Sequence, residues 1–273
     1  MGIAIVIFLV FLLLGMPVAF AIGISGFSFF IIRDLPMTML VQKSISATQS
    51  FTMLAIPLFI LAGNLMNATG ITKRLMRLAN VLTGHMYGNV GQVSCVLSTL
   101  MGGVSGSAVA DAAMETRILG PEMERLGYAK GWAAAINGLS GLIVATIPPS
   151  MGLIIYGTVG EVSIGRLFMA GWVPGLLMMV LLMLATSWSA RRFGYKPEHT
   201  QRATLKQIGR EIVSSIWALL FPVLLIVLIR FGIMSPSESG AFACAYALFV
   251  GIVIYKELNW ETLMKTLKDS VKD

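Results

Sequence analysis

The chain is poor in charge, since Asp, Glu, Lys and Arg make up only 12% of its 273 residues, about half of the share in soluble domains. Hydrophobic residues make up 56%, and 28 glycines add to them. This composition excludes an ordinary soluble domain and indicates an integral membrane protein in a lipid bilayer. The net charge of +7 does not indicate nucleic acid, because the basic residues lie between apolar spans, where they set topology.

Cysteine and histidine are also scarce. Cys95 and Cys244 lie in apolar segments, so no disulfide framework is indicated. His85 and His199 lie far apart, without the partners that a metal site or a His-based catalytic system needs. The sequence has no P-loop, and the segment Gly103–Ser107 does not match the nucleophile elbow, which requires Gly two residues after the Ser. We therefore expect no enzyme and no cofactor.

Several apolar stretches predict an all-α, multi-span protein, since most of them approach the roughly 20 residues that cross a bilayer core. The first contains the segment Gly15–Pro17, so we expect either one tilted or kinked helix or two closely spaced spans. The stretches are 2–32, 50–68, about 90–103, 131–157, 167–190, 212–230 and 237–255.

A re-entrant hairpin is predicted over about 90–119. The stretch 90–103 is too short to span, and it runs through the small-residue segment Met101–Asp111 into a second short arm, 108–119. Non-helical backbone at membrane depth is tolerated only where protein buries it or where it lines a polar cavity. Two short arms that meet at a Gly/Ser tip therefore predict a hairpin with both ends on one side, at a site for polar cargo.

The distribution of basic residues supports this hairpin. If the segment 191–211 is cytoplasmic and the hairpin does not cross, sixteen of the 20 Lys and Arg residues lie on the cytoplasmic side. The N-terminus is then cytoplasmic as well. We also expect the charges at the end of the second arm to be solvated or paired at the cytoplasmic end of the hairpin. They are Glu115, Glu122, Glu124 and Arg125.

A weak internal sequence similarity indicates an inverted repeat. The segment Ala19–Ala21 before Arg33–Leu40 resembles Ala241–Ala243 before Lys256–Leu263, at nearly the same spacing. Residues 1–234 would then form a first repeat with a connecting span, and 235–273 the start of a second repeat that is cut off. Within it, 259–273 is either an amphipathic surface helix or a frayed tail.

The hairpin tip is the first candidate site. Its glycines, Gly102, Gly103 and Gly106, allow φ > 0 and close approach of the backbone, and Ser105 and Ser107 supply hydroxyls. The second arm starts at Ala108, where helix N–H groups favour an anion, while the carbonyls that end the first arm favour a cation. Asp111 follows in the first turn, either as a ligand or only as a stabiliser of the helix dipole. Close helix packing is the alternative for the small residues.

The second candidate site is the Ile147–Ser150 break inside the span 131–157. Pro148 and Pro149 lack N–H groups, so the break should free the carbonyls of Val144 and Ala145, which can then coordinate Na⁺. The hydroxyl of Ser150 adds a ligand. Asn137, Ser140 and Gly141 lie up to three turns earlier on the same span. A proline kink that serves packing alone is the alternative.

Six motifs in order resemble the large membrane subunit of tripartite ATP-independent periplasmic (TRAP) transporters, over essentially the whole chain. They are Gly15-Met-Pro-Val-Ala-Phe20, Leu54-Ala-Ile-Pro-Leu-Phe-Ile60, Ser105-Gly-Ser-Ala-Val-Ala-Asp111, Ile147-Pro-Pro-Ser150, Leu167-Phe-Met-Ala-Gly171 with Pro174-Gly175, and Ser235-Pro-Ser-Glu238.

The resemblance implies an elevator-type secondary transporter of the bacterial inner membrane. It would be driven by Na⁺, fed with an organic anion such as a C4-dicarboxylate, sialic acid or sugar acid by a periplasmic binding protein, and stabilised by a small four-helix membrane subunit. The resemblance also implies that half of the substrate and Na⁺ site lies on the hairpin tip and the Ile147–Ser150 break. These residues are Ser105, Gly106, Ser107, Ala108, Asp111, Pro148, Pro149 and Ser150.

The chain departs from this family in length, because its members carry a complete second inverted repeat with its own hairpin. Glu115, in the second arm of the hairpin, is a smaller departure. A truncated membrane remnant or scaffold that transports nothing is therefore the competing hypothesis.

Overall fold

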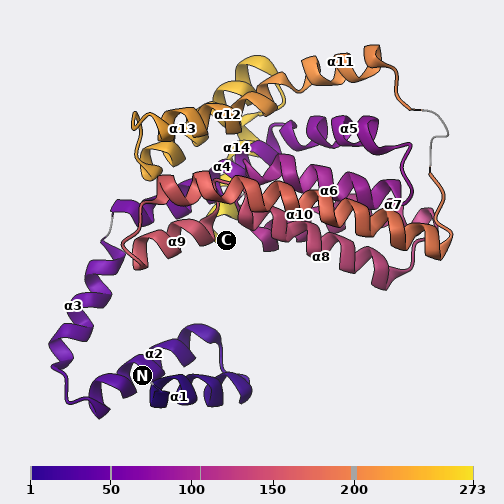
Figure 1. The fold of residues 1–273 in the computed structure, drawn as a ribbon. Helices are drawn as coiled ribbons and strands as arrows, with labels where there is room; N and C mark the ends of the chain where they lie inside the picture. Colours follow the sequence, from indigo (N-terminus) through magenta and orange to yellow (C-terminus); the bar gives the residue numbers. More distant parts are fainter. Residues whose placement is uncertain (1, 50, 105, 198–201, 273) are drawn as a thin grey trace. The chain divides into compact units, whose positions relative to one another are not determined.

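The computed structural model describes residues 2–49, 51–104, 106–197 and 202–272, and every regular element in these ranges is a helix (Figure 1). The expectation of an all-α protein is therefore confirmed for this part of the chain. The chain divides into two compact units, Met1–Ser50 and Phe51–Asp273. This boundary differs from the repeat boundary expected at 234/235, and the division into repeats stays a prediction.

The first unit holds α1 (Gly2–Leu13), α2 (Val18–Ile32) and α3 (Met37–Thr48). The first apolar stretch is thus two helices, and α1 packs against α2. Gly15, at φ +80°, closes α1, while the Met16 N–H donates to the Phe11 carbonyl at 3.1 Å as in a Schellman motif. Pro17 then precedes α2. The Gly-Met-Pro segment therefore ends one helix and starts the next.

The second unit contains the candidate sites. Its helices begin with the 3₁₀ turn η1 (Phe51–Leu54) and include one π-helix, η2 (Val250–Ile254). The α-helices are α4 (Ala55–Ala68), α5 (Ile71–Thr83), α6 (Asn89–Gly102), α7 (Ala108–Arg125), α8 (Lys130–Thr146), α9 (Met151–Val159), α10 (Ile164–Phe193), α11 (Leu205–Ser214), α12 (Ile216–Arg230), α13 (Pro236–Phe249) and α14 (Trp260–Lys272).

Among the described residues, three helical segments are long and apolar enough to cross a membrane: Phe51–Ala68, Ile164–Phe193 and Pro236–Ile254. The number rises to five if each of two bent pairs, α8 with α9 and α11 with α12, is one span. The arms α6 and α7 do not pass this test. With 14 and 18 residues they measure about 21 and 27 Å, less than the roughly 30 Å of a bilayer core.

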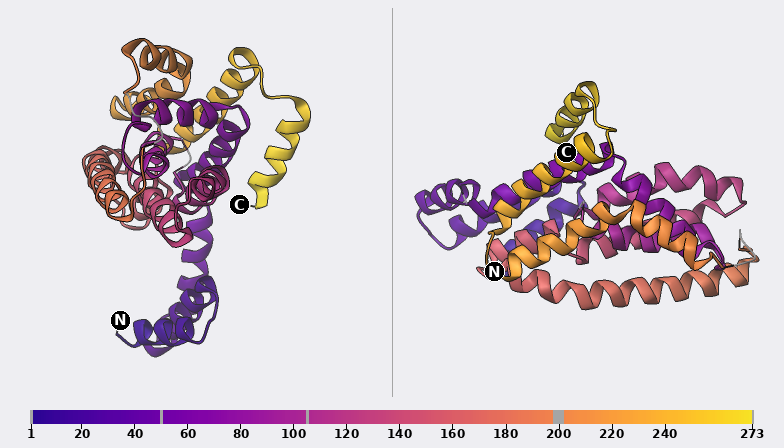
Figure 2. Two further views of the ribbon diagram at one scale, coloured as in Figure 1. Left: turned by 90° about the vertical axis from the view of Figure 1, so that its right-hand side faces the viewer. Right: turned by 90° about the horizontal axis from the view of Figure 1, so that it is seen from above.

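The helices of the second unit form two neighbouring groups. In the first, α6 and α7 both pack against α8, and the long α10 runs beside α6 and α8 (Figures 1 and 2). In the second, α4 packs against α13 and α14, and α12 packs against α13. The predicted amphipathic helix over 259–273 is confirmed as α14, which lies against α4.

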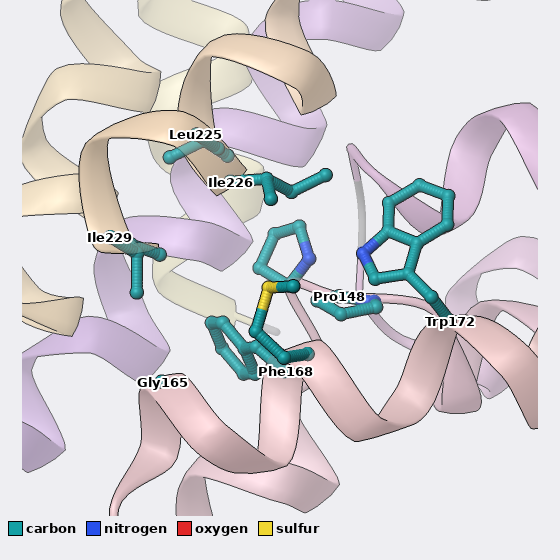
Figure 3. Close-up of a pocket in the computed structure, with 9 residues that line it drawn as sticks. Pro148, Gly165, Phe168, Trp172, Leu225, Ile226 and Ile229 are labelled. Carbon is teal, nitrogen blue, oxygen red and sulfur yellow. The ribbon is translucent and has the colours of Figure 1, made fainter. Parts of the chain in front are cut away.

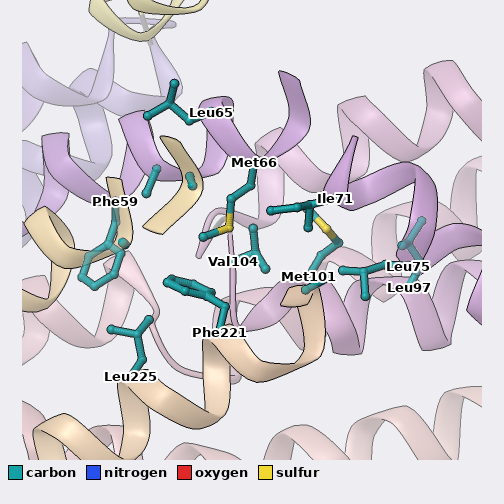
Figure 4. Close-up of a cluster of buried hydrophobic side chains, with 14 of the residues drawn as sticks. Phe59, Leu65, Met66, Ile71, Leu75, Leu97, Met101, Val104, Phe221 and Leu225 are labelled. Carbon is teal, nitrogen blue, oxygen red and sulfur yellow. The ribbon is translucent and has the colours of Figure 1, made fainter. Parts of the chain in front are cut away.

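An apolar core joins the hairpin tip to the second group of helices. Val104 of the tip is fully buried, and Figure 4 shows it among Met66 of α4, Met101 of α6 and Phe221 of α12. A Cβ on Gly103 would lie 2.3 Å from the Cβ of Pro222 in α12. The tip is therefore held by close packing against α4 and α12.

Candidate functional site

The arms α6 and α7 form an antiparallel hairpin held by polar side chains. Ser98 lies opposite Asp111, with 2.7 Å between its Oγ and the Oδ2 of Asp111. Ser94, one turn earlier, lies opposite Glu115, one turn later, at 2.5 Å. At the base, the Tyr128 hydroxyl donates to Asn89 Oδ1 at 3.0 Å. The two arms thus return to the same end, although α7 continues past residue 119 to Arg125.

The structure brings the tip and the Pro-Pro break together. The Met151 N–H donates to the Gly106 carbonyl at 3.2 Å. Gly106 has φ +62°, and a Cβ there would lie 2.5 Å from the Pro149 carbonyl oxygen. Both the dihedral angle and the contact therefore require glycine. Ser105, which the sequence also places in the site, lies outside the described residues.

The other two tip glycines allow a close approach, as expected, but without a positive φ. Among the tip glycines, Gly106 has a positive φ, whereas Gly102 and Gly103 do not. A Cβ on Gly102 would lie 2.8 Å from the Cβ of Ile147, at the end of α8. Gly102 and Gly103 thus serve close packing between helices, the alternative that the sequence left open.

The start of α7 is capped and tightly packed. The Ser107 hydroxyl accepts from the Ala110 N–H at 3.3 Å as the N-cap of the helix. A Cβ on Gly141 of α8 would lie 2.8 Å from the Ala108 carbonyl oxygen, so the first turn of α7 lies directly on α8. The Ser107 hydroxyl retains its own proton as a donor.

The break between α8 and α9 bends the chain by 47°, and it corrects one expectation. The Ala145 carbonyl has a partner that the sequence did not predict, because the Ser150 hydroxyl donates to it at 2.5 Å, and one of its two lone pairs remains for another partner. The same hydroxyl accepts from the Leu153 N–H at 3.4 Å and caps α9. A buried carbonyl without an N–H partner takes the nearest hydroxyl, since an unpaired one is costly. Val144 is fully buried beside Gly102.

Asn137 does not lie beside the hairpin tip or the Pro-Pro break. It is 2% exposed and lines a separate cavity of about 330 Å³ with Thr116 and Tyr128, toward the base of the hairpin. Asn137 lies nine residues before the end of α8, which separates it from the break by about 14 Å along the helix axis. Its Oδ1 has no hydrogen-bond partner among the described residues.

Two acidic side chains lie inside the hairpin. Asp111 is 1% exposed, and Glu115 is fully buried. The Ser98 hydroxyl contacts both, at 2.7 Å from Asp111 Oδ2 and 2.8 Å from Glu115 Oε1. Ser94 and Ser140 reach Glu115 Oε2 at 2.5 and 3.0 Å. No ion pair of the described residues involves either acid.

The prediction that Glu115 is solvated or paired at the end of the hairpin is therefore wrong. It holds for Glu122, which pairs with Arg125, and for Glu124, which pairs with Lys130 at 3.1 Å. The i, i+4 spacing of Asp111 and Glu115 on one helix, matched by Ser94 and Ser98 on the other arm, is the signal in the sequence that indicates this buried polar stripe.

A larger cavity, of about 450 Å³, lies between α4 and the start of α7. Ser107, Asp111 and Met151 line it on the side of the tip and the break, and Asn64 and Asn67 line it on the side of α4. Asp111 Oδ1 has no hydrogen-bond partner among the described residues. The sequence did not indicate the contribution of α4, since no local motif connects these asparagines with the tip.

The opposite side of the break packs on α10 and α12. A cavity of about 10 Å³ remains there, enough for about one water molecule. Figure 3 shows the indole ring of Trp172 facing Pro148, with Leu225 and Ile226 of α12 above. The lining is almost entirely apolar, so this side serves packing, and the polar side of the break is the one that faces the hairpin tip.

Comparison with known proteins now decides the family. The sequence model of the family described as "Tripartite ATP-independent periplasmic transporter, DctM component" matches residues 5–273. The chain belongs to this family. The resemblance inferred from the six motifs is thereby confirmed. The chain is a multi-pass membrane protein of a transporter family and not an enzyme.

Curated relatives cover almost all of this DctM-family chain. It is 40% identical over 260 residues to the 2,3-diketo-L-gulonate TRAP transporter large permease protein YiaN of Escherichia coli (strain K12), which is 95% of this chain and 61% of the relative. It is 36% identical over 265 residues to the sialic acid TRAP transporter permease protein SiaT of Haemophilus influenzae (strain 86-028NP), which is 97% of this chain and 43% of the relative.

A third relative is the C4-dicarboxylate TRAP transporter large permease protein DctM of Rhodobacter capsulatus. The identity is 31% over 274 residues, which is 95% of this chain and 62% of the relative. The chain thus spans about three-fifths of the length of YiaN and of this DctM protein.

Proposed function

We propose that this chain is the part of a Na⁺-coupled, elevator-type permease that carries one half of the site for an organic carboxylate. A periplasmic binding protein would deliver the substrate, and a small four-helix membrane subunit would stabilise the permease in the bacterial inner membrane. The observation that carries the proposal is the direct contact between the Gly106 carbonyl and the Met151 N–H, because it joins two broken helical segments beside a polar cavity.

The contact brings four helix ends together. The α6 and α8 helices end near it, and α7 and α9 begin near it. Carbonyls at helix C-termini attract a cation, and N–H groups at helix N-termini attract an anion. Discontinuous helices at mid-membrane use these ends for substrate and coupling ion. We propose that Na⁺ binds through oxygens of Gly106, Ser107 and Val144, with Asp111 nearby, and that the carboxylate lies at the starts of α7 and α9.

The proposed orientation has the hairpin entering the membrane from the cytoplasm, and it places the N-terminus in the cytoplasm when α1 and α2 together cross the membrane once. Two features support it. The arms α6 and α7 are shorter than a bilayer core and return to one end, where Asn89 meets Tyr128. A hairpin that does not cross gives a split of basic residues of sixteen against four, which agrees with the positive-inside rule.

The substrate class rests on the relatives. Their names give diketogulonate, sialic acid and C4-dicarboxylate as the transported compounds, and a carboxylate is common to all three. We therefore infer that the permease containing this chain takes a carboxylate.

The test is uptake of radiolabelled carboxylates into proteoliposomes that contain the complete permease, its small subunit and its binding protein. We expect uptake to require an inward Na⁺ gradient and to be lost in Gly106→Ala, whose Cβ would press on the Pro149 carbonyl. Gly138→Ala is the matched control, since a Cβ on Gly138 meets no atom within 4 Å. Full uptake without Na⁺, or normal uptake by the Gly106 variant, would refute the proposal.

A further inference from the structure

The cavity between α4 and the hairpin has a chemistry of its own. Asn64 and Asn67 are three residues apart on α4 and line the same cavity, as expected for neighbours on one helix face. Asp111 and Ser107 line it from α7. The volume of about 450 Å³ falls within the roughly 300–1,000 Å³ that is typical of small-molecule sites.

Hydrogen bonds from outside the cavity hold both asparagines. The Thr72 hydroxyl donates to Asn67 Oδ1 at 2.5 Å, which leaves the NH₂ group of Asn67 as a donor for a ligand. The Asn64 amide nitrogen donates to Ser270 Oγ of α14 at 3.1 Å. Side chains that are fixed in this way lose little freedom on binding a ligand. The α4 side of the cavity is thus a rigid pair of neutral amides.

Asp111 provides an acceptor on the other side. It is 1% exposed, Ser98 occupies its Oδ2, and its Oδ1 has no partner among the described residues. A buried carboxyl oxygen without a donor is costly, and a ligand hydroxyl would satisfy it. None of the described residues that line the cavity is Lys, Arg or His. A second carboxylate would therefore meet an acidic side chain here, with no basic residue of the lining to balance it.

We propose that this cavity binds the hydroxyl-bearing part of the substrate, and that the permease selects polyhydroxylated carboxylates over unsubstituted dicarboxylates. Asn64 and Asn67 would bind hydroxyl or keto oxygens, and Asp111 Oδ1 would accept from a hydroxyl. The carboxylate of the same substrate stays near the starts of α7 and α9, beside Met151. The inference rests on the proposed function, and it adds the substrate class and the residues that determine it.

The experiment measures initial uptake in the reconstituted complete system. The polyhydroxylated probes are D-gluconate, D-glucuronate and N-acetylneuraminate, and the probes without hydroxyls are succinate and hexanoate. The variants are Asn64→Ala and Asn67→Ala, with Asn80→Ala of α5, which does not line the cavity, as the matched control. The same binding protein serves every variant, so a change in selectivity belongs to the permease.

We expect the wild type to take up at least one polyhydroxylated probe in preference to both succinate and hexanoate. Each cavity variant should raise KM for that probe roughly tenfold, the effect of losing one or two hydrogen bonds, and should leave the slow uptake of succinate unchanged. A wild type that prefers succinate overturns the inference even if no variant folds. Cavity variants that lose uptake equally for both classes of probe overturn it as well. Failure of the wild type to take up any carboxylate overturns the proposed function instead.

Discussion

Removing Ser98 should destabilise the hairpin more than removing Glu115, although Glu115 makes more hydrogen bonds. In Glu115→Leu every hydroxyl of the cluster keeps an acceptor. Ser98 donates to Asp111, Ser94 to Ser140 at 2.8 Å, and Ser140 to the Asn137 carbonyl at 3.0 Å. The variant also removes a buried carboxyl, a change that is often neutral when an apolar group of similar size replaces it. We expect a change in stability within about 1 kcal/mol.

In Ser98→Ala, by contrast, Asp111 Oδ2 and Glu115 Oε1 both lose the Ser98 hydroxyl, the one hydrogen-bond partner of each among the described residues. Each buried polar atom left unpaired costs about 1–3 kcal/mol, so the sum is about 2–6 kcal/mol. The double variant, Ser98→Ala with Glu115→Leu, leaves only Asp111 Oδ2 newly unpaired. Its loss of stability should therefore be about half of the loss in Ser98→Ala alone. Ser98 and Glu115 should therefore be coupled in a double-mutant cycle.

The assay is thermal unfolding of the purified complete permease in detergent, for the wild type, both single variants and the double variant. The matched control is Thr99→Val on the same helix. Its hydroxyl donates to the Cys95 carbonyl of its own turn at 2.8 Å, so we expect a shift within about 0.5 kcal/mol. Equal losses for Ser98→Ala and Glu115→Leu, or additive losses in the double variant, would refute this account of the cluster.

Two further predictions concern the hairpin as a whole. Tyr128→Phe removes the hydroxyl that donates to Asn89 at the hairpin base, and it should lower stability by about 0.5–1.5 kcal/mol in the same assay; an unchanged unfolding temperature would show that this bond does not hold the base. Single cysteines at the exposed positions Tyr87 and Glu124, in a background without native cysteines, should both be labelled from the cytoplasmic side alone. Labelling from opposite sides would mean that the hairpin crosses the membrane.

Some features of this protein follow from residues close together in the chain. Pro148 and Pro149 end α8 because they lack N–H groups, Ser107 caps α7, and Gly15 with Pro17 separates α1 from α2. Each of these effects acts through the backbone within a few residues, so the sequence alone determines where the helices break. The meeting of the tip and the break was expected on weaker grounds, since it needed a shared polar function to connect two separate motifs.

Only the tertiary structure decided what surrounds each polar group. Glu115 looks like a charge at a helix end, but it is buried because α6 and α8 bring Ser94, Ser98 and Ser140 around it. The Ala145 carbonyl looks free after the prolines, yet the Ser150 hydroxyl folds back on it. Asn64 and Asn67 carry no local signal at all and reach the site through the packing of α4. Burial and partnership depend on contacts between distant segments, which helix-forming patterns within one segment do not encode.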